Sequence, residues 1–249
     1  MRTVLVLLTL FTATPIAATV VIVAAVLGAE DRAGSVFDRM LRWWASALVR
    51  AAGVELVVHG WEHAEGAQHI FVANHGSWCD VPALGTILTR FKFVAKAELA
   101  RVPLFGAAVR AIGSVYIDRG NRASSVESLR EAAAKIHGGA SVVVFAEGTR
   151  GTGYPLRPFK KGAFVLAINA QAPIVPVVIH GAIDVLPRGR FRVRAGRVNV
   201  HFLEPVPAAG LTYDDRNALA EEVRNRMAWL LRERYGVESP EWRPRRNDA

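Results

Sequence analysis

The chain is poor in cysteine: its 249 residues contain only Cys79. One cysteine excludes an internal disulfide and cannot supply a metal site built from several thiolates. The seven histidines do not lie at the spacing of metal ligands either. The sequence therefore predicts no metal site, and we expect no cofactor.

Two kinds of motif are also missing from the sequence. The chain lacks the G-x-S-x-G elbow that carries the serine of many α/β-hydrolases, and it lacks the motifs of nucleic-acid-binding modules. Its net charge is nevertheless +9. Such an excess of positive charge indicates an anionic partner. We expect that partner to be a phosphate or an acidic lipid, and no nucleic acid.

Charge is absent from residues 3–29, which follow Arg2. A helix of that length is about 40 Å long and can cross a bilayer. The stretch is longer than the apolar core of a secretory signal and ends in no clear small-x-small cleavage site. We predict a retained membrane anchor. It either spans the bilayer or forms a kinked or re-entrant segment, because Pro15 lies near its middle.

Residues 35–52 carry apolar side chains at helical spacing, among them Phe37, Leu41 and Trp44, with arginines between them. An amphipathic helix of this kind lies in a membrane interface, with tryptophan at headgroup level. The alternative is an ordinary amphipathic helix that packs on the domain. We assign residues 1–52 to a membrane anchor and an interfacial helix.

From residue 53 onward, short β-rich runs alternate with helical stretches. This alternation predicts one layered α/β domain over residues 53–239, with a mostly parallel or mixed sheet flanked by helices. A basic C-terminal tail follows at residues 240–249. The expected strands are 54–59, 70–73, 91–95, 114–117, 141–145, 174–179 and 198–203. The expected helices are 81–89, 99–111, 124–137, 161–170 and 214–235.

The strand expected at residues 70–73 runs directly into His75, and Asp80 follows five positions later. Residues five apart are about 140° apart on a helix and on opposite faces of a strand, so their side chains meet only if the backbone turns. Gly76 and Ser77 permit such a turn. A histidine held by a carboxylate is the geometry of an oriented general base. The alternative is a histidine that caps a loop beside an unrelated aspartate.

Polar residues also follow two other expected strands. One short strand leads into Arg119, and the apolar run at 141–145 stops just before Glu147. Gly148 allows a tight turn between Glu147 and Arg150. Because functional residues of α/β domains collect at strand ends, we expect these groups to lie near His75.

A fourth block contains Pro173 and Pro176, which indicate a strand at an edge or a bend of the sheet. Lys92, Lys96 and Lys160 add positive charge beside the expected strand ends. Together the blocks place a base, a carboxylate and several cations at one edge of the sheet.

In their order along the chain, these four blocks resemble the motifs of the glycerophospholipid acyltransferase family, in particular the 1-acyl-sn-glycerol-3-phosphate (lysophosphatidic acid) acyltransferases. The resemblance covers about residues 53–210, and four motifs in order are a specific signal. One departure is Gly151, where many relatives have serine. The matching positions are Asn74-His75-x4-Asp80, Gly113-x3-Ile117-x-Arg119, Phe145-x-Glu147-Gly148-Thr149-Arg150 and Pro173-x2-Pro176-Val177-x-Ile179.

The resemblance implies a role for each motif. The first supplies the catalytic pair, with His75 as general base and Asp80 as the group that orients it. The fourth is linked to the acyl donor or to the shape of the site. The second and third are associated with binding the glycerol phosphate, through Arg119, Glu147, Gly148, Thr149 and Arg150.

Some roles stay open within this resemblance. Glu147 either binds a glycerol oxygen or holds Arg119 or Arg150 in place. A backbone N–H or Lys96 would support the oxyanion. Further candidate site residues are Asn74, Lys96, Lys160 and Pro176.

The implied reaction moves a fatty acyl group from acyl-CoA or acyl-ACP to the free hydroxyl of lysophosphatidic acid. The product is phosphatidic acid, as in phospholipid biosynthesis. We expect a protein associated with membrane lipids of the cell inner membrane or plasma membrane, with its catalytic domain on the cytoplasmic side, where the family finds its acyl thioesters.

Four alternatives remain. The acceptor could be another lysolipid, such as a lyso-ornithine lipid, or water, which would make the protein a thioesterase. The chain could instead be a basic lipid-binding membrane module without catalysis. Cys79 could pair with His75 as a nucleophile.

Arginines alternate with other residues between positions 188 and 194. In a hairpin strand this parity would place all four on one face, and we predict that this face meets the membrane. The alternative is a solvated edge whose charges prevent aggregation.

Overall fold

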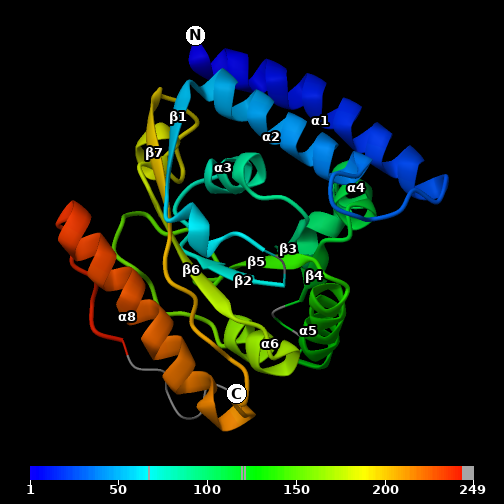
Figure 1. Ribbon diagram of the computed structural model, residues 1–249. Coiled ribbons are helices and arrows are strands. Elements are labelled where there is room, and N and C mark those ends of the chain that lie inside the picture. The colour runs from blue at the N-terminus through cyan, green and yellow to red at the C-terminus, as the bar shows by residue number, and fades with distance from the viewer. Residues whose placement is uncertain (67, 119, 121, 243–249) are drawn as a thin grey trace.

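The computed structural model describes residues 1–66, 68–118, 120 and 122–242 (Figure 1). Its described part contains a seven-stranded sheet with the spatial order β1-β7-β6-β2-β5-β3-β4. The strands are β1 (Val54–His59), β2 (Ile70–Ala73), β3 (Phe91–Lys96), β4 (Val115–Ile117), β5 (Ser141–Phe145), β6 (Ile174–His180) and β7 (Gly196–Phe202).

Strands β6, β2, β5, β3 and β4 run parallel to one another. β7 is antiparallel to β6, and β1 is parallel to β7. The sheet is therefore mixed and mostly parallel, as the sequence predicted. Because five adjacent strands share one direction, their carboxyl ends form a single edge, where α/β domains place their sites.

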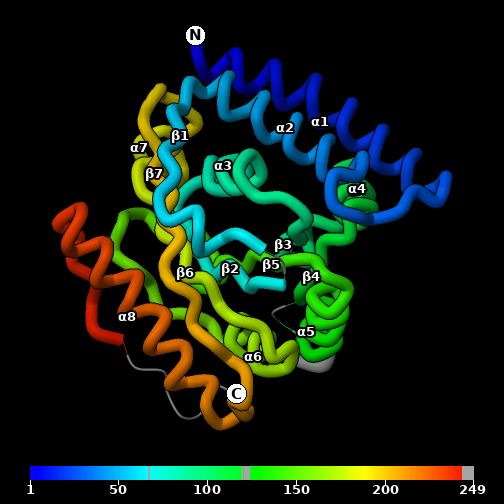
Figure 2. The backbone as a smooth tube through the Cα atoms, in the orientation of Figure 1, coloured from blue at the N-terminus to red at the C-terminus, as the bar shows by residue number. Residues whose placement is uncertain are grey.

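Helices cover both faces of the sheet (Figure 2). One face is covered by α5 (Arg122–His137), α6 (Gly162–Ala170) and α8 (Arg216–Tyr235), and the other by α2 (Val36–Ala52), α3 (Asp80–Ile87) and α7 (Ala182–Val185). A strand buried on both faces must be apolar at every position, which explains why β2 is an unbroken apolar run.

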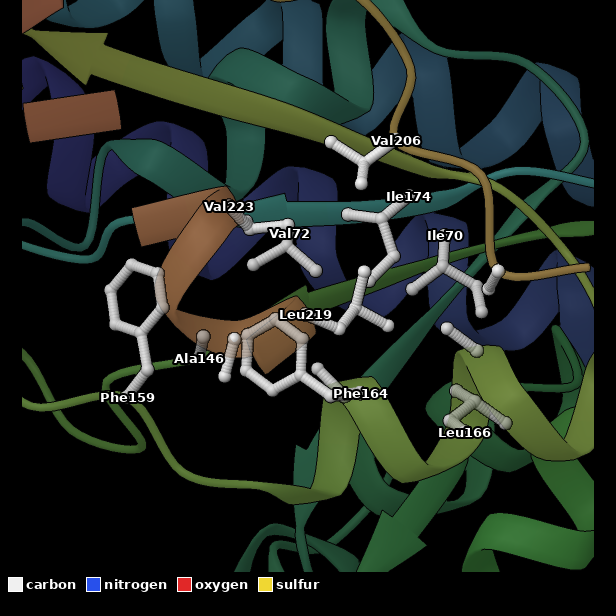
Figure 3. Close-up of a cluster of buried hydrophobic side chains, with 14 of the residues drawn as sticks. Ile70, Val72, Ala146, Phe159, Phe164, Leu166, Ile174, Val206, Leu219 and Val223 are labelled. Carbon is white, nitrogen blue, oxygen red and sulfur yellow. The ribbon is translucent and has the colours of Figure 1, made fainter. Parts of the chain in front are cut away.

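Alternate residues of β2 enter two separate cores, as the two-residue period of a strand requires. Ile70 and Val72 belong to the core on the α6 and α8 side, while Phe71 and Ala73 belong to the other. Figure 3 shows the first core, in which Ile70, Val72 and Ile174 of the sheet face α6 and α8. The helical side chains labelled there are Phe164 and Leu166 of α6 and Leu219 and Val223 of α8.

The uncharged N-terminal stretch forms one continuous helix, α1 (Arg2–Val26), which contains Pro15. It is the one described helix whose length and composition would allow it to cross a membrane. α1 lies along α2 rather than projecting from the domain (Figure 1), and Trp44 Nε1 of α2 donates a hydrogen bond to Thr14 Oγ1 at 2.9 Å. One side of α1 is buried through its alanines, and the opposite side leaves Leu8 and Phe11 exposed.

Two expected elements differ in the structure. The helix expected at 99–111 is split into a short 3-10 helix, Ala97–Arg101, and α4 (Phe105–Ala111). Pro103 disfavours helical backbone at the residue before it, and Leu104 has a positive φ of 62°. The strand expected at 188–194 is wrong: this segment is an irregular loop with a turn at Gly189, where φ is +78°.

An ion pair between a buried lysine and an exposed aspartate fastens the connection between α1 and α2 to the sheet. Lys92 of β3 is buried, and its Nζ lies 2.8 Å from Asp31 Oδ1. The same ammonium donates to the carbonyl of Ile112 at 2.7 Å. Lys92 therefore holds the N-terminal helices in place, rather than adding charge to the strand ends as expected.

We expect Asp31→Asn to lower the free energy of unfolding by about 2 kcal/mol, because the buried ammonium loses its only described carboxylate partner. The cost stays below that of a fully buried pair, since Asp31 is partly exposed. Glu55→Gln is the control: it removes the exposed ion pair with Arg197 and should cost less than about 1 kcal/mol. Chemical unfolding in detergent measures both, and equal losses would contradict the role given to Lys92.

Candidate active site

The backbone turns after β2 and brings His75 onto Asp80. His75 Nδ1 lies 2.8 Å from Asp80 Oδ2, and the same oxygen accepts the backbone N–H groups of Gly76 at 2.9 Å and Ser77 at 2.8 Å. A carboxylate oxygen that accepts these bonds also accepts the Nδ1 hydrogen, which leaves the lone pair of the imidazole on Nε2. The turn predicted from Gly76 and Ser77 is present.

The ring of His75 is also fixed from the side of β5. It stacks on Phe145, with ring centroids 4.1 Å apart and planes 20° apart. The backbone N–H of His75 donates to Glu147 Oε1 at 3.2 Å, and its carbonyl accepts the N–H of Gly151 at 2.7 Å. Its side chain remains 15% exposed, so the imidazole is both positioned and accessible.

Glu147 is buried, with 6% of its surface exposed. Burial raises the pKa of Glu147 to about 7, although the N–H of His75 and the charge of Arg157 act in the opposite direction. Its oxygen binds the main chain of His75, and it forms no ion pair with Arg150 in the described part of the chain. The sequence analysis expected Glu147 to bind a glycerol oxygen or to hold an arginine. The structure instead shows it bound to the backbone of His75.

Arg150 lies beside the His75–Asp80 pair, above an aromatic ring. Its Cζ is 4.5 Å from the ring centroid of Trp78. Burial and the guanidinium of Arg188 lower the pKa of Arg150, while Asp80 opposes them. The carbonyl of Arg150 accepts hydrogen bonds from Arg188 Nη1 at 2.5 Å and from Arg157 Nη1 at 3.4 Å.

A turn sets the direction of Arg150. Gly148 has a φ of +75°, which favours glycine, and its N–H donates to the Phe145 carbonyl at 3.0 Å. Thr149 is exposed, and its carbonyl accepts from Arg157 Nη1 at 3.2 Å. A cleft of about 320 Å³ lies next to this turn, lined by Trp78, Arg150, Leu186, Pro187, Arg190 and Phe191 among others.

Asn74 joins the first and fourth motifs. Its Nδ2 donates to the carbonyl of Ile179 at 2.9 Å, and its Oδ1 accepts the Ile179 N–H at 2.7 Å. Pro176 lies within β6, where it pairs with Val72. The expected edge position of this strand is wrong, because β6 lies between β2 and β7. The carbonyl of Pro176 accepts the N–H of Leu203, just beyond the end of β7, at 2.9 Å.

Two other candidates, Lys96 and Lys160, make no described contact with His75. Lys96 ends β3 with a half-exposed side chain, and its Nζ lies 3.7 Å from Glu98. Lys160 is exposed, and its backbone N–H donates to Ala146. Arg119 lies outside the described residues.

Cys79 cannot act as the nucleophile of a cysteine–histidine pair. It is buried, and burial together with the charge of Asp80 raises the pKa of its thiol to about 12. The thiolate is the reactive form of cysteine, so this alternative is wrong. Among the described residues, no group of three or more His, Cys, Asp or Glu is arranged to hold a metal.

Two contributors were missed at the sequence level, Trp78 as the stacking partner of Arg150 and Arg157 as the donor to the 149–150 carbonyls. Trp78 lies inside the His75–Asp80 block, so its position was a usable signal. Arg157 had no signal, because only the folded loop brings it back to Arg150.

The fold and this constellation define an α/β protein with a histidine, oriented by a buried carboxyl group, at the carboxyl edge of its sheet. Residues 55–180 match the family model described as Acyltransferase. The crystal structure of the 1-acyl-sn-glycerophosphate (LPA) acyltransferase PlsC from Thermotoga maritima is similar, with a TM-score of 0.77 and 26% identity. The match covers 96% of this chain and 100% of that chain.

Curated relatives point to the same family. The chain is 36% identical over 184 residues to 1-acyl-sn-glycerol-3-phosphate acyltransferase alpha of Homo sapiens, over 73% of this chain and 65% of that protein. It is 31% identical over 219 residues to the lyso-ornithine lipid O-acyltransferase of Pseudomonas aeruginosa, over 82% of this chain and 81% of that protein. The chain therefore belongs to the acyltransferase family, and the resemblance stated from its motifs is confirmed.

The titration of Glu147 yields a prediction. Its pKa in the folded state, about 7, exceeds the ordinary value of 4.5, so the folded protein binds this proton more tightly than the unfolded chain. The stability that the proton gives is complete below about pH 4.5 and lost as pH rises through 7. Between about pH 4.5 and pH 7 the wild type should lose on the order of 3 kcal/mol of unfolding free energy through this group. We expect Glu147→Gln to lack that loss, because glutamine cannot ionise.

Chemical unfolding of wild type and Glu147→Gln at pH 5 and pH 8 measures this loss. The two proteins share every other titrating group, so only the difference between their pH slopes matters. Parallel slopes would show that Glu147 ionises at its ordinary pKa.

Proposed function

We propose that the protein transfers a fatty acyl group from an acyl thioester, acyl-CoA or acyl-ACP, to the free hydroxyl of 1-acyl-glycerol-3-phosphate. The product is phosphatidic acid, in phospholipid biosynthesis. The observation that carries this proposal is the 2.8 Å contact between His75 and buried Asp80 beside the cationic Arg150. Membership of the acyltransferase family supports it.

In this mechanism the acceptor is itself the nucleophile. Nε2 of His75 takes the hydroxyl proton while the oxygen attacks the thioester carbonyl carbon. The new C–O bond forms, the C–S bond breaks, and the proton passes from Nε2 to the leaving thiolate. Asp80 fixes the tautomer and stabilises the imidazolium, and acid–base assistance of this kind is worth about 10²–10⁴-fold in rate.

Glu147 and Phe145 position the base. Glu147 holds the backbone of His75, and Phe145 fixes the plane of its ring. Because a thioester transfer is favourable in free energy, correct placement of base and acceptor supplies much of the acceleration. The N–H groups of Gly76 and Ser77 bind Asp80, so a different donor stabilises the oxyanion.

Arg150 binds the acceptor phosphate, together with Arg119. Guanidinium groups bind phosphate through paired, charge-assisted hydrogen bonds. The stacking of Arg150 on Trp78 holds the guanidinium above the ring before the substrate arrives. Fixing this side chain in advance lowers the entropy lost on binding.

The protein works at the membrane, with its catalytic domain on the cytoplasmic side of the inner or plasma membrane. The exposed apolar side of α1 supports the association with lipid. The cytoplasmic side follows from the acyl thioester donors of the family.

A lyso-ornithine lipid is the second candidate acceptor. The relative that acts on that lipid, by its name, aligns over 82% of this chain and 81% of its own length. An arginine beside the base would bind the carboxylate of such a lipid as well as a phosphate. A non-catalytic lipid-binding module gives no account of the His75–Asp80 pair.

We expect His75→Ala to lower phosphatidic acid formation by about 10²–10⁴-fold, because it removes the base. The assay uses membranes that carry each protein, lysophosphatidic acid and a labelled acyl thioester. His137→Ala, at the exposed end of α5, is the matched control and should retain activity.

The same assay separates the rival functions. Acylation of lyso-ornithine lipid in preference to lysophosphatidic acid would select the second acceptor. Release of free fatty acid without any acylated lipid would make the protein a hydrolase.

We expect Arg150→Gln to raise the KM for lysophosphatidic acid at least about tenfold, since a hydrogen bond to a charged group contributes roughly 1.5–3 kcal/mol. The KM for the acyl thioester should change much less. Arg232→Gln, which removes an exposed guanidinium from α8, is the control. An equal rise in both KM values would argue against phosphate binding by Arg150.

A further inference from the structure

The loop between α7 and β7, residues 186–195, displays unpaired cations around an exposed aromatic ring; we call it the arginine loop. Phe191 is 62% exposed. Apart from the bond from Arg188 to the Arg150 carbonyl, no arginine side chain of this loop forms a hydrogen bond or ion pair with another described residue. The exposed arginines are Arg188, Arg190, Arg192 and Arg194.

The backbone of the arginine loop is fastened at its base. The N–H of Arg194 donates to the carbonyl of Val185 at 2.9 Å. The N–H of Val193 donates to Thr3 Oγ1 at 3.0 Å, and the side chain of Val193 is buried in the core beneath α2 and α3. The loop therefore presents Phe191 and the arginines on a fixed support.

Thr3 belongs to α1, so this contact makes the arginine loop continuous with the exposed side of that helix. Figure 1 shows the segment before β7 beside the N-terminal end of α1. Val4, Leu5 and Leu8 are exposed at that end. Exposed apolar side chains next to unpaired cations match an anionic membrane surface, in which acyl chains lie below negatively charged headgroups.

The other side of the arginine loop reaches the active site. Arg188 binds the Arg150 carbonyl, and Ser77 Oγ donates to the Leu186 carbonyl at 2.8 Å. The cleft beside Trp78 lies between this loop and the loop that carries His75. One wall of the cleft is thus formed by the loop that carries the unpaired cations.

We propose that the arginine loop docks on an anionic bilayer. Phe191 enters the apolar side of the interface, and the arginines around it lie on the lipid headgroups. The cleft beside Trp78 then opens toward the lipid layer, so that the acceptor reaches Arg150 directly from the membrane. This last step rests on the proposed function, whereas the docking itself does not.

The first test places an environment-sensitive fluorophore on Phe191→Cys in the full chain, with the buried native thiol removed by Cys79→Ala. The protein is reconstituted in vesicles of phosphatidylcholine with phosphatidylglycerol. We expect lipid-borne quenchers to reach this probe and aqueous iodide not to reach it. The matched probe at Trp229→Cys, on the exposed face of α8, should show the reverse. Equal access of iodide to both probes would overturn the docking.

The second test neutralises the cations. Arg190→Gln, Arg192→Gln and Arg194→Gln are combined, because each arginine near an anionic surface increases the membrane-binding constant roughly fivefold. We expect the preference for anionic over neutral vesicles to fall at least about tenfold. The control combines Arg130→Gln, Arg232→Gln and Arg234→Gln, which remove the same charge from exposed positions on α5 and α8.

Two outcomes separate this proposal from its rivals. An unchanged vesicle preference, together with a raised KM for acyl-ACP but not for acyl-CoA, would assign the arginine loop to an acidic carrier protein and overturn it. A lipid-quenched probe in a protein that acylates no lysolipid would contradict only the proposed function. An active protein with a water-exposed probe would contradict only the docking.

Discussion

One carboxylate oxygen organises this site. Asp80 Oδ2 accepts the N–H groups of Gly76 and Ser77 and also the imidazole of His75. The two backbone bonds close the turn after β2, and the third bond sets the ring orientation. One buried carboxyl group thus holds the loop and orients the imidazole of His75. Asp80 is the first residue of α3. The position of that helix against the sheet therefore sets where the carboxyl group meets the ring of His75.

Hydrogen bonds link the end of the central strand β2 to the two neighbouring strands. Asn74 at its end binds the backbone of Ile179 on β6, and His75 binds Glu147 just beyond β5. In each of these hydrogen bonds a side chain contacts a main-chain atom of the neighbouring segment. The bonds therefore fix the strand ends relative to one another. Three adjacent strands are joined where the proposed substrate would bind, although they come from distant parts of the sequence.

The sequence predicted the structure correctly where a local pattern of residues determines the local backbone conformation. An apolar run followed by glycine and serine permitted a turn, and the turn unites His75 with Asp80. It failed where the outcome depends on distant partners. Nothing near Lys92 in the sequence indicates that Asp31 pairs with its buried ammonium. In the arginine loop, alternation alone suggested a strand, but β7 begins only at Gly196. The resemblance of four ordered motifs identified the family, because it combines signals that are individually weak.

The pairing of β1 with β7 has a consequence for synthesis of the chain. Val54 pairs with Gly196, and the described part of β1 has no other strand beside it. During translation, β1 therefore leaves the ribosome long before its partner exists, and at roughly 5–20 residues per second it waits on the order of ten seconds. Throughout that interval its edge is open to incorrect partners. If the N-terminal helices bind the membrane as proposed, they keep this segment away from other unfolded chains during that interval.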